Sequence, residues 1–309
     1  MVSDGPVPVS VVILTHNEER NLRACLESVA GWAAAVYVVD SGSTDATLMV
    51  ARQFDAVVAA HAFDTHARQW AWALAQLPLA TEWVLALDAD QRLTPELRAS
   101  IASALAAPGA ANGYFVCRRQ VFRGRWIRHG GYYPKYLLKL FRRQHLSIDH
   151  ADLVDHHFHV AAPTGRLRGD LIEDNRNEAQ IADWTAKHNR YAVLQARQEL
   201  VAASGPAIGI GALFGSPDDR TRWLKRVWAG LPLYLRPVLY VAYRYVLRFG
   251  WLDGKEGFIF HVLQGFWYRL LVDINIDEQR TAAGPATATT VDRAALPVSA
   301  VPESDGRKV

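Results

Sequence analysis

The chain has 309 residues, of which 50% are hydrophobic and 21% are charged, and its formal net charge is +3. The length fits one large domain, or one domain with an appendage, and the apolar fraction is enough for a sizeable core. So small a positive charge gives no indication of binding to nucleic acid.

The first expected strand is the apolar run at residues 9–14, which stops at the polar residues Thr15, His16, Asn17 and Glu18. After it, residues 21–29 place apolar side chains at the 3.6-residue spacing of a helix. The chain therefore opens with a strand followed by a helix.

Two further short apolar runs, 36–39 and 83–87, read as buried strands. The first ends at Asp40-Ser41-Gly42 and the second at Asp88-Ala89-Asp90. Helical patterns follow Asp40 and cover residues 67–77. Strands that alternate with helices predict a parallel α/β sheet, and ligands bind such sheets at the carboxyl ends of the strands.

The sequence Asp88-Ala89-Asp90 puts two carboxylates two residues apart, where both can reach one cation or one diphosphate. Thr94-Pro95-Glu96 is a good helix start by itself, so neither aspartate is needed as a cap. Carboxylate oxygens suit Mg²⁺ or Mn²⁺. A metal held beside phosphates at a strand end indicates nucleotide chemistry.

Three motifs in this order, T-x-N-E, V-V-D-S-G-S-T-D-x-T and L-D-A-D, resemble the amino-terminal half of family 2 inverting glycosyltransferases with the GT-A fold. The similarity extends over about residues 8–275. Residues 128–134, 140–143 and 249–254 are similar to the subgroup that contains the lipopolysaccharide-core β-glucosyltransferases. The resemblance implies a Rossmann-like mixed sheet with flanking helices, and here also a carboxyl-terminal amphipathic helical appendage.

The resemblance also assigns expected site residues. Asp40 would accept a hydrogen bond from the base of the nucleotide, Asp88 would lie near the ribose, and Asp88 and Asp90 would hold Mn²⁺ or Mg²⁺ on the diphosphate. The full set expected to bind the nucleotide sugar is Thr15, Asn17, Glu18, Asp40, Ser41, Gly42, Asp88, Arg128 and Arg142.

An inverting transfer needs a general base that takes the proton of the acceptor hydroxyl. Asp155 is the first candidate, and Asp174 and Glu173 are the alternatives. The acidic pair at 173–174 can also be interpreted as the start of a helix, where carboxylates complement the helix dipole. The sequence leaves the three carboxylates open.

The expected organisation is a short tail at 1–8, a catalytic domain at 9–200, a linker loop at 201–219, an amphipathic helical region at 220–280 and a disordered tail at 281–309. In the helical region, Arg236, Arg244 and Arg248 fall on one stripe of a helix. The apolar segment 257–268 follows. This pattern favours contact with an anionic membrane surface, and the alternatives are a helical hairpin packed on the core or a true membrane span.

The expected function is metal-dependent, inverting transfer of a hexose from a nucleotide sugar, chiefly a UDP-sugar, to a glycan of the lipid-linked, lipopolysaccharide or exopolysaccharide type. Residues 1–8 have neither a basic segment nor an apolar run, so we expect a peripheral enzyme on the cytoplasmic side of the inner membrane. The alternatives are transfer to a polyprenyl phosphate, and a non-catalytic protein that binds sugar nucleotides or acts as a membrane scaffold.

Overall fold

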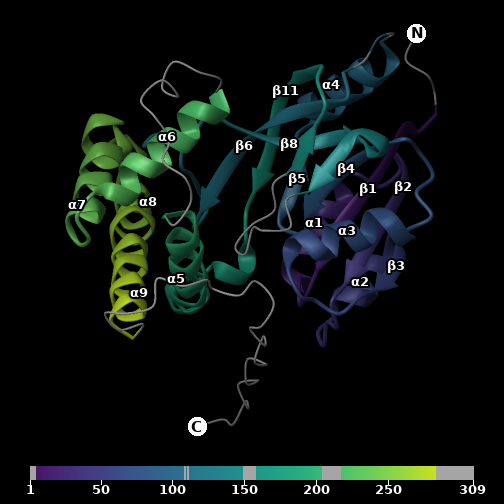
Figure 1. Cartoon of the computed structure of the whole chain (residues 1–309). Coiled ribbons are helices and arrows are strands. Elements are labelled where there is room, and N and C mark those ends of the chain that lie inside the picture. The colour runs from purple at the N-terminus through teal and green to yellow at the C-terminus, as the bar shows by residue number, and fades with distance from the viewer. Residues whose placement is uncertain (1–4, 108, 110, 149–157, 204–216, 283–309) are drawn as a thin grey trace.

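The computed structural model describes residues 5–107, 109, 111–148, 158–203 and 217–282. A mixed β-sheet with helices on both faces occupies the amino-terminal part of the chain, and a group of helices follows it (Figure 1). The expected α/β class with a helical carboxyl-terminal region is therefore confirmed.

The strands of the main sheet are β1 (Val7–Thr15), β2 (Ala33–Asp40), β3 (Val57–Ala60), β4 (Trp83–Asp88), β5 (Gln91–Leu93), β6 (Gly113–Phe122), β7 (Arg125–Trp126), β8 (Lys135–Arg142) and β11 (Thr164–Glu173). A separate hairpin consists of β9 (Leu146–Ile148) and β10 (Phe158–Val160). The α-helices are α1 (Glu19–Glu27), α2 (Thr47–Gln53), α3 (His66–Gln76), α4 (Pro95–Ala106), α5 (Ile181–Ala203), α6 (Pro217–Gly230), α7 (Leu235–Ala242), α8 (Gly254–Phe260) and α9 (Tyr268–Ala282). Short 3₁₀-helices are η1 (Arg143–His145), η2 (Arg176–Glu178) and η5 (Gly250–Asp253), and π-helical turns are η4 (Tyr243–Leu247) and η6 (His261–Trp267).

The main sheet has the strand order β3-β2-β1-β4-β8-β6-β11-β5, with β7 paired to β6. The first four strands in this order are parallel to one another. Strand β8 is antiparallel to both β4 and β6, so β6 and its parallel neighbour β11 run in the same direction as β4. The carboxyl ends of β1, β2, β4 and β11 therefore meet at one edge of the sheet.

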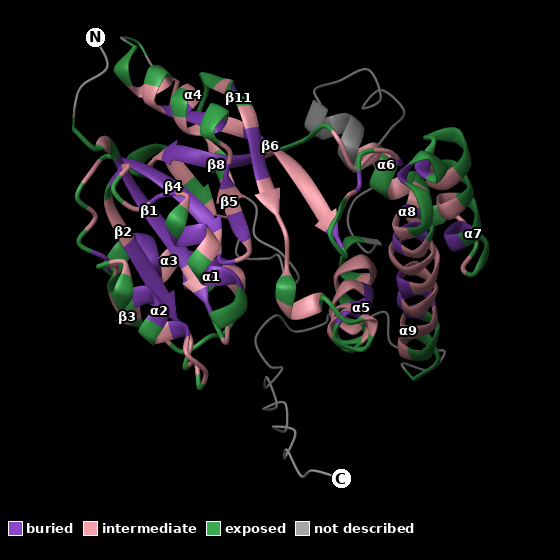
Figure 2. Cartoon of the chain, turned by 180° about the vertical axis from the view of Figure 1, so that it is seen from behind, coloured by how far each residue is buried: buried purple, intermediate pink, exposed green. Residues whose placement is uncertain are grey.

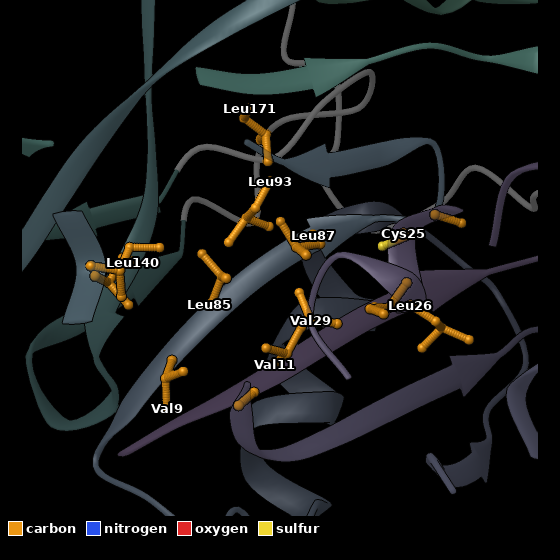
Figure 3. Close-up of a cluster of buried hydrophobic side chains, with 14 of the residues drawn as sticks. Val9, Val11, Cys25, Leu26, Val29, Leu85, Leu87, Leu93, Leu140 and Leu171 are labelled. Atoms are coloured by element: carbon orange, nitrogen blue, oxygen red, sulfur yellow. The ribbon is translucent and has the colours of Figure 1, made fainter. Parts of the chain in front are cut away.

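Alternation along β1 explains the two layers of helices. Val9, Val11 and Ile13 point to the side covered by α1, α2 and α4, and Val12 points to the side covered by α3. Figure 3 shows the first of these clusters, with Leu93 between Leu87 and Leu171. Helix α4 begins as expected, because Thr94 caps it and Pro95 occupies its first turn.

The carboxyl-terminal helices pack against the sheet domain through an aromatic cluster. Phe260 lies among Phe122, Ile127 and Trp184, and all four side chains are buried. Part of the apolar segment 257–268 thus packs on the core, while Phe258 is 52% exposed, and contact of this segment with a membrane stays a prediction. No helix within the described ranges has the length and apolar character needed to cross a membrane.

The arginines 236, 244 and 248 do not form the predicted exposed stripe, because Arg236 is buried. Arg236 is 2% exposed and forms ion pairs with Asp273 on α9 and Glu199 on α5. Arg244 is partly buried and donates to the carbonyl of Gly130, and only Arg248 is exposed. Instead of a single helix, α7 ends at Ala242 and a π-turn follows, so positions four apart no longer share one face.

The expected linker at 201–219 is shorter in the structure, because α5 continues to Ala203 and α6 begins at Pro217. The remainder of that linker lies outside the described residues, as does the expected tail beyond residue 282. The buried cysteines Cys25 and Cys117 form no disulfide.

Candidate active site

A cavity of about 1030 Å³ opens at the carboxyl edge of the sheet. Its walls come from the ends of β1 and β4, from the loop after β2, from the end of β11 with the residues that follow it, and from one face of α5. This is the position at which open α/β sheets bind ligands.

Strand register places the expected residues together. Thr15 pairs with Asp40 across β1 and β2, and Leu14 pairs with Asp88 across β1 and β4. The chain then leaves β4, and Gln91 on β5 pairs with Glu173 on β11. The segment after Asp88 thus passes from the middle of the sheet to its far strand along the carboxyl edge.

Seven of the expected site residues line the cavity: Thr15, Asn17, Glu18, Ser41, Asp88, Asp90 and Glu173. Asp40 and Gly42 lie beside it, in the loop that Ser41 belongs to. Asp174, Arg128 and Arg142 are not part of the lining. Asp155 lies outside the described residues.

Asp40 supports the loop after β2 from behind. It is 3% exposed, and its Oδ2 accepts from the backbone N–H groups of Gly42 and Ser43 at 3.0 and 2.9 Å. Its Oδ1 accepts from the hydroxyls of Thr15 and Ser43. Gly42 has a φ of +83°, a conformation that favours glycine. In this structure Asp40 shapes the loop that presents Ser41 to the cavity.

Asn17 and Glu18 form the wall at the end of β1. The backbone of Asn17 has a φ of 54°, and its side-chain Oδ1 accepts from the N–H of Thr44, which ties β1 to the loop after β2. The carboxylate of Glu18 accepts from Asn21 and Asn177. Burial raises the pKa of Glu18, and the hydrogen bond from Asn21 offsets part of this.

Asp88 has a buried partner that the sequence did not reveal. The Nζ of Lys139 on β8 lies 3.0 Å from Oδ2 of Asp88, and the Lys139 side chain is 5% exposed. In the sequence Lys139 resembles a surface lysine of a basic stretch. The available signal was its position inside the apolar strand 137–141, where a lysine requires a carboxylate partner.

Asp90 lies among other carboxylates. Burial raises the pKa of Asp90 well above its ordinary value, and the negative charges of Glu173, Asp88 and Glu18 raise it further. Six carboxylates line the cavity, against the cations of Lys187 and Arg190 and two histidines. An anionic diphosphate can occupy such a cavity only with additional positive charge.

This donor set fits a divalent cation. Asp88 and Asp90 supply hard oxygen atoms, and their surroundings carry an excess of negative charge. In the part of the chain that is described, no three His, Cys, Asp or Glu side chains already converge as a ligand set. Mg²⁺ commonly uses one or two carboxylates and completes its shell with water and substrate phosphates, so two aspartates suffice.

Glu173, the last residue of β11, and Asp174, which follows it, lie in different environments. The Oε1 of Glu173 lies 3.0 Å from Nη1 of Arg118, and its Oε2 accepts from Gln91 at 2.9 Å. Asp174 instead pairs with Arg92 at 3.1 Å, and its backbone N–H donates to the carbonyl of Asp90. Glu173 therefore faces the cavity, and Asp174 holds the loop of Asp90 in place.

Helix α5 contributes a wall that the sequence did not predict. Asp183, Lys187, Arg190 and Leu194 line the cavity at helical spacing. Burial lowers the pKa of Lys187, but the adjacent Glu178 carboxylate outweighs this and raises it above its ordinary value. Lys187 thus carries a positive charge opposite the aspartates.

Arg142 and Arg128 lie away from this cavity. Arg142 pairs with Trp83 at the amino end of β4, where its Nη1 is 2.6 Å from Glu82. The backbone N–H of Arg128 donates to Asp253 of the carboxyl-terminal helices. Neither arginine lines the cavity in this structure.

Comparison with known proteins identifies the family of this chain. The profile of glycosyl transferase family 2 matches residues 10–169, which is more than half of the chain. The chain belongs to this family, and it is a glycosyltransferase with a sheet of the GT-A type.

Similar proteins include the lipopolysaccharide core biosynthesis glycosyltransferase LpsC of Rhizobium meliloti strain 1021, which is 28% identical over 211 residues, or 65% of this chain and 74% of LpsC. An uncharacterised glycosyltransferase of Rickettsia bellii is 33% identical over 93 residues, and the match spans only 30% of this chain and 31% of that protein.

Two solved structures are also similar. The structure of TarS 1–349 from S. aureus has a TM-score of 0.41 at 14% identity and covers 89% of this chain and 91% of its own. Glucosyl-3-phosphoglycerate synthase from Mycobacterium tuberculosis, in complex with Mn²⁺, uridine diphosphate and glucosyl-3-phosphoglycerate, has a TM-score of 0.40 at 18% identity and covers 62% of this chain and 79% of its own.

Proposed function

We propose that this chain is an inverting, metal-dependent glycosyltransferase that moves a hexose from a UDP-sugar to a lipid-linked or lipopolysaccharide-type glycan. The observation that carries the proposal is the cavity in which Asp88, at the end of β4, and Asp90, in the turn that follows, face the ends of β1 and β11. Family membership supports sugar transfer, and the site supports a nucleotide-sugar donor.

The donor diphosphate would lie between the aspartates and α5. Asp88 and Asp90 would hold Mg²⁺ or Mn²⁺, which when bound offsets the charge of the leaving nucleoside diphosphate. Lys139 keeps one oxygen of Asp88 fixed, and Lys187 and Arg190 supply positive charge from the opposite wall. Thr15, Asn17 and the loop at Ser41 would enclose the nucleoside.

In an inverting transfer the oxygen of the acceptor hydroxyl bonds to the anomeric carbon while the bond from that carbon to the diphosphate oxygen breaks. The hydroxyl proton passes to a carboxylate on the acceptor side. Asp155 is the proposed base. Among the described residues, Glu173 is the alternative that faces the cavity, since Asp174 is held by Arg92 and the backbone of Asp90.

The proposed acceptor follows from the similarity to LpsC, a lipopolysaccharide core biosynthesis enzyme. An acceptor glycan anchored in a membrane would place the enzyme at the cytoplasmic face of that membrane as a peripheral protein. The polar walls of the cavity suit hydroxyl-rich substrates, which form hydrogen bonds with such groups.

A donor screen tests this proposal. Nucleotide release from UDP-, GDP- and TDP-hexoses would be measured with Mn²⁺, with Mg²⁺ and with EDTA. We expect release from UDP-hexoses that requires the metal and is unchanged in the control variant Glu27→Gln, which alters an exposed residue on the outer face of α1. Metal-independent release, or a clear preference for GDP- or TDP-hexoses, would contradict the proposal. Inversion would be read from the anomeric configuration of the glycoside formed.

A further inference from the structure

The exposed apolar side chains of this protein are concentrated in one region. Of the eighteen large hydrophobic side chains that are exposed in the described part of the chain, thirteen lie between residues 224 and 258. The segment 234–258, which contains α7, η4 and η5, forms a surface that we call the apolar surface. Figure 2 shows α7 largely in the colour of exposed residues, at the end of the molecule far from β3.

Only one face of α7 is covered by the rest of the protein. Its inner face buries Pro237 and the Arg236 ion pairs against α5 and α9. Its outer face exposes Leu235, Val238 and Leu239 by 46–48%. A helix that lies on the protein surface normally carries polar residues on its outer face, so the exposed apolar residues of α7 indicate that this face contacts a partner.

The turn after α7 exposes still larger side chains. Val246, Leu247, Phe249 and Trp251 are 57%, 68%, 56% and 52% exposed. Phe249 has a φ of 59°, which costs a bulky residue about 1–2 kcal/mol relative to glycine. This conformation occurs between η4 and η5, and it leaves the Phe249 ring 56% exposed.

The charges near Phe249 and η5 are complementary to an anionic partner. Arg128, Arg248 and Lys255 are exposed there. Of the two acids in the described segment 223–260, Asp253 is buried against His129 and Glu256 is partly buried, whereas the exposed Asp277 of α9 accepts from Tyr234 at the other end of the apolar surface. An amphipathic region with aromatic and aliphatic residues on its outer face, and with arginine and lysine at its rim, is typical of segments that lie in the interface of an anionic bilayer.

We propose that the apolar surface inserts into the headgroup region of an anionic lipid bilayer, with Leu247, Phe249 and Trp251 as its deepest residues. In the arrangement expected from the sequence, the stripe of Arg236, Arg244 and Arg248 and the apolar segment 257–268 made the contact; here Arg236 is buried, and the segment 234–258 makes it. The proposal rests on the proposed function only in assigning the enzyme to a membrane, and it is measured without donor or acceptor.

The test is co-sedimentation of the full chain with vesicles of phosphatidylcholine and phosphatidylglycerol at 3:1, and with vesicles of phosphatidylcholine alone. We expect binding to the anionic vesicles, and a decrease of about 100-fold in partitioning for the double variant Leu247→Ser, Trp251→Ser. The matched control is Met49→Ser, Val57→Ser, which removes two exposed apolar side chains near the opposite edge of the sheet and should bind like the parent. Arg248→Gln, Lys255→Gln should bind about tenfold more weakly to the anionic vesicles only.

Three results would overturn the proposal. The parent protein does not bind the anionic vesicles, the Leu247/Trp251 variant binds as well as the parent, or the parent is a dimer that the same variant converts to a monomer, which would mean that two copies of the chain cover this surface. Nucleotide release in the absence of vesicles should be normal in every variant. If the parent releases no nucleotide but binds vesicles in the expected pattern, the proposed function fails and the membrane contact stands.

Discussion

Lys139 and Asp88 form an ion pair across two antiparallel strands, with Nζ of the lysine 3.0 Å from Oδ2 of the aspartate. The lysine is buried, and the aspartate is partly open to the cavity. This pair places a fixed positive charge behind the first of the two proposed metal ligands.

Substitution of the lysine should therefore destabilise the metal-free protein. Lys139→Met keeps the apolar stem but leaves Asp88 without this ion pair. In EDTA we expect the free energy of unfolding to fall by about 2 kcal/mol, measured by urea denaturation. Added Mn²⁺ should restore part of this loss, because a bound cation stabilises the folded state. The control Lys135→Met, at an exposed position of the same strand, should change stability by less than about 0.5 kcal/mol.

Asp90→Asn should separate activity from stability. It preserves shape but removes one charge from a site where Glu173 and Asp88 already oppose ionisation. Nucleotide release should fall by about 10²–10³-fold because stabilisation of the leaving group is lost. The melting temperature in EDTA should be unchanged or higher. Near-normal release by this variant, or a wild-type protein indifferent to EDTA, would mean that Asp90 does not hold a metal.

The three candidate bases can be distinguished with matched amides. We expect Asp155→Asn to abolish transfer and to leave UDP-sugar binding intact, because the proton acceptor does not belong to the donor site. Asp174→Asn should weaken the Arg92 pair and lower activity only modestly. Binding by calorimetry and transfer by product formation would be measured for each. If Asp155→Asn stays active and Glu173→Gln binds donor without transfer, Glu173 is the base.

The buried arginine on α7 should be a stability determinant. Arg236→Leu leaves Asp273 and Glu199 without their common partner, and Asp273 is only 1% exposed. Loss of one member of a buried ion pair costs about 3 kcal/mol or more. Thermal and urea denaturation would measure it, with Arg248→Gln as the exposed control on the following turn. Equal stability of the two variants would indicate that the pairs around Arg236 contribute nothing.

His261 should make stability depend on pH. Burial lowers the pKa of His261 from 6.5 to about 4. The nearby charges of Arg244 and His129 also lower it, and the carboxylate of Asp253 partly offsets these effects. Tyr132, Tyr245 and Phe260 enclose the ring. Between pH 6.5 and 4 the unfolded chain binds a proton at this residue and the folded chain does not, so stability falls as pH falls through that window.

The expected contribution of His261 is about 3 kcal/mol in total between those pH values. The measurement is the unfolding free energy across the window for the parent and for His261→Leu, whose slope against pH should be smaller. His159→Gln, which removes an exposed imidazole, is the control. An identical slope in the parent and the His261 variant would mean that folding does not lower the pKa of His261.

The parallel half of the sheet could be predicted because each of its strands is marked by a short apolar run in the sequence. Runs such as 9–14 and 83–87 are apolar enough to be buried on both faces, and their polar ends must then meet at one edge. That reasoning correctly gathered Thr15, Ser41, Asp88 and Asp90 around one cavity.

Long-range pairings could not be predicted in the same way. The partners of Lys139 and Arg236 lie 51 and 37 residues away in sequence, and their local patterns are those of a surface strand and an amphipathic helix. The segment 257–268 has the same apolarity whether it meets lipid or protein. Its packing against Phe122 and Trp184 therefore could not be predicted from that pattern.

The segment 89–91, which connects β4 to the strand paired with β11, forms a rigid rim of the cavity. The side chain of Gln91 donates a hydrogen bond to Glu173, and the backbone N–H of Asp174 donates to the carbonyl of Asp90. These hydrogen bonds join the segment after β4 to the end of β11 next to the aspartates. The opposite rim is one face of α5, joined to the sheet through the short turn at 176–178. Opening motions of the cavity should therefore move α5 more than the rim formed by residues 90–91 and 173–174. Amide hydrogens near Gln91 and Asp174 should exchange slowly with solvent, and those at the start of α5 should exchange faster.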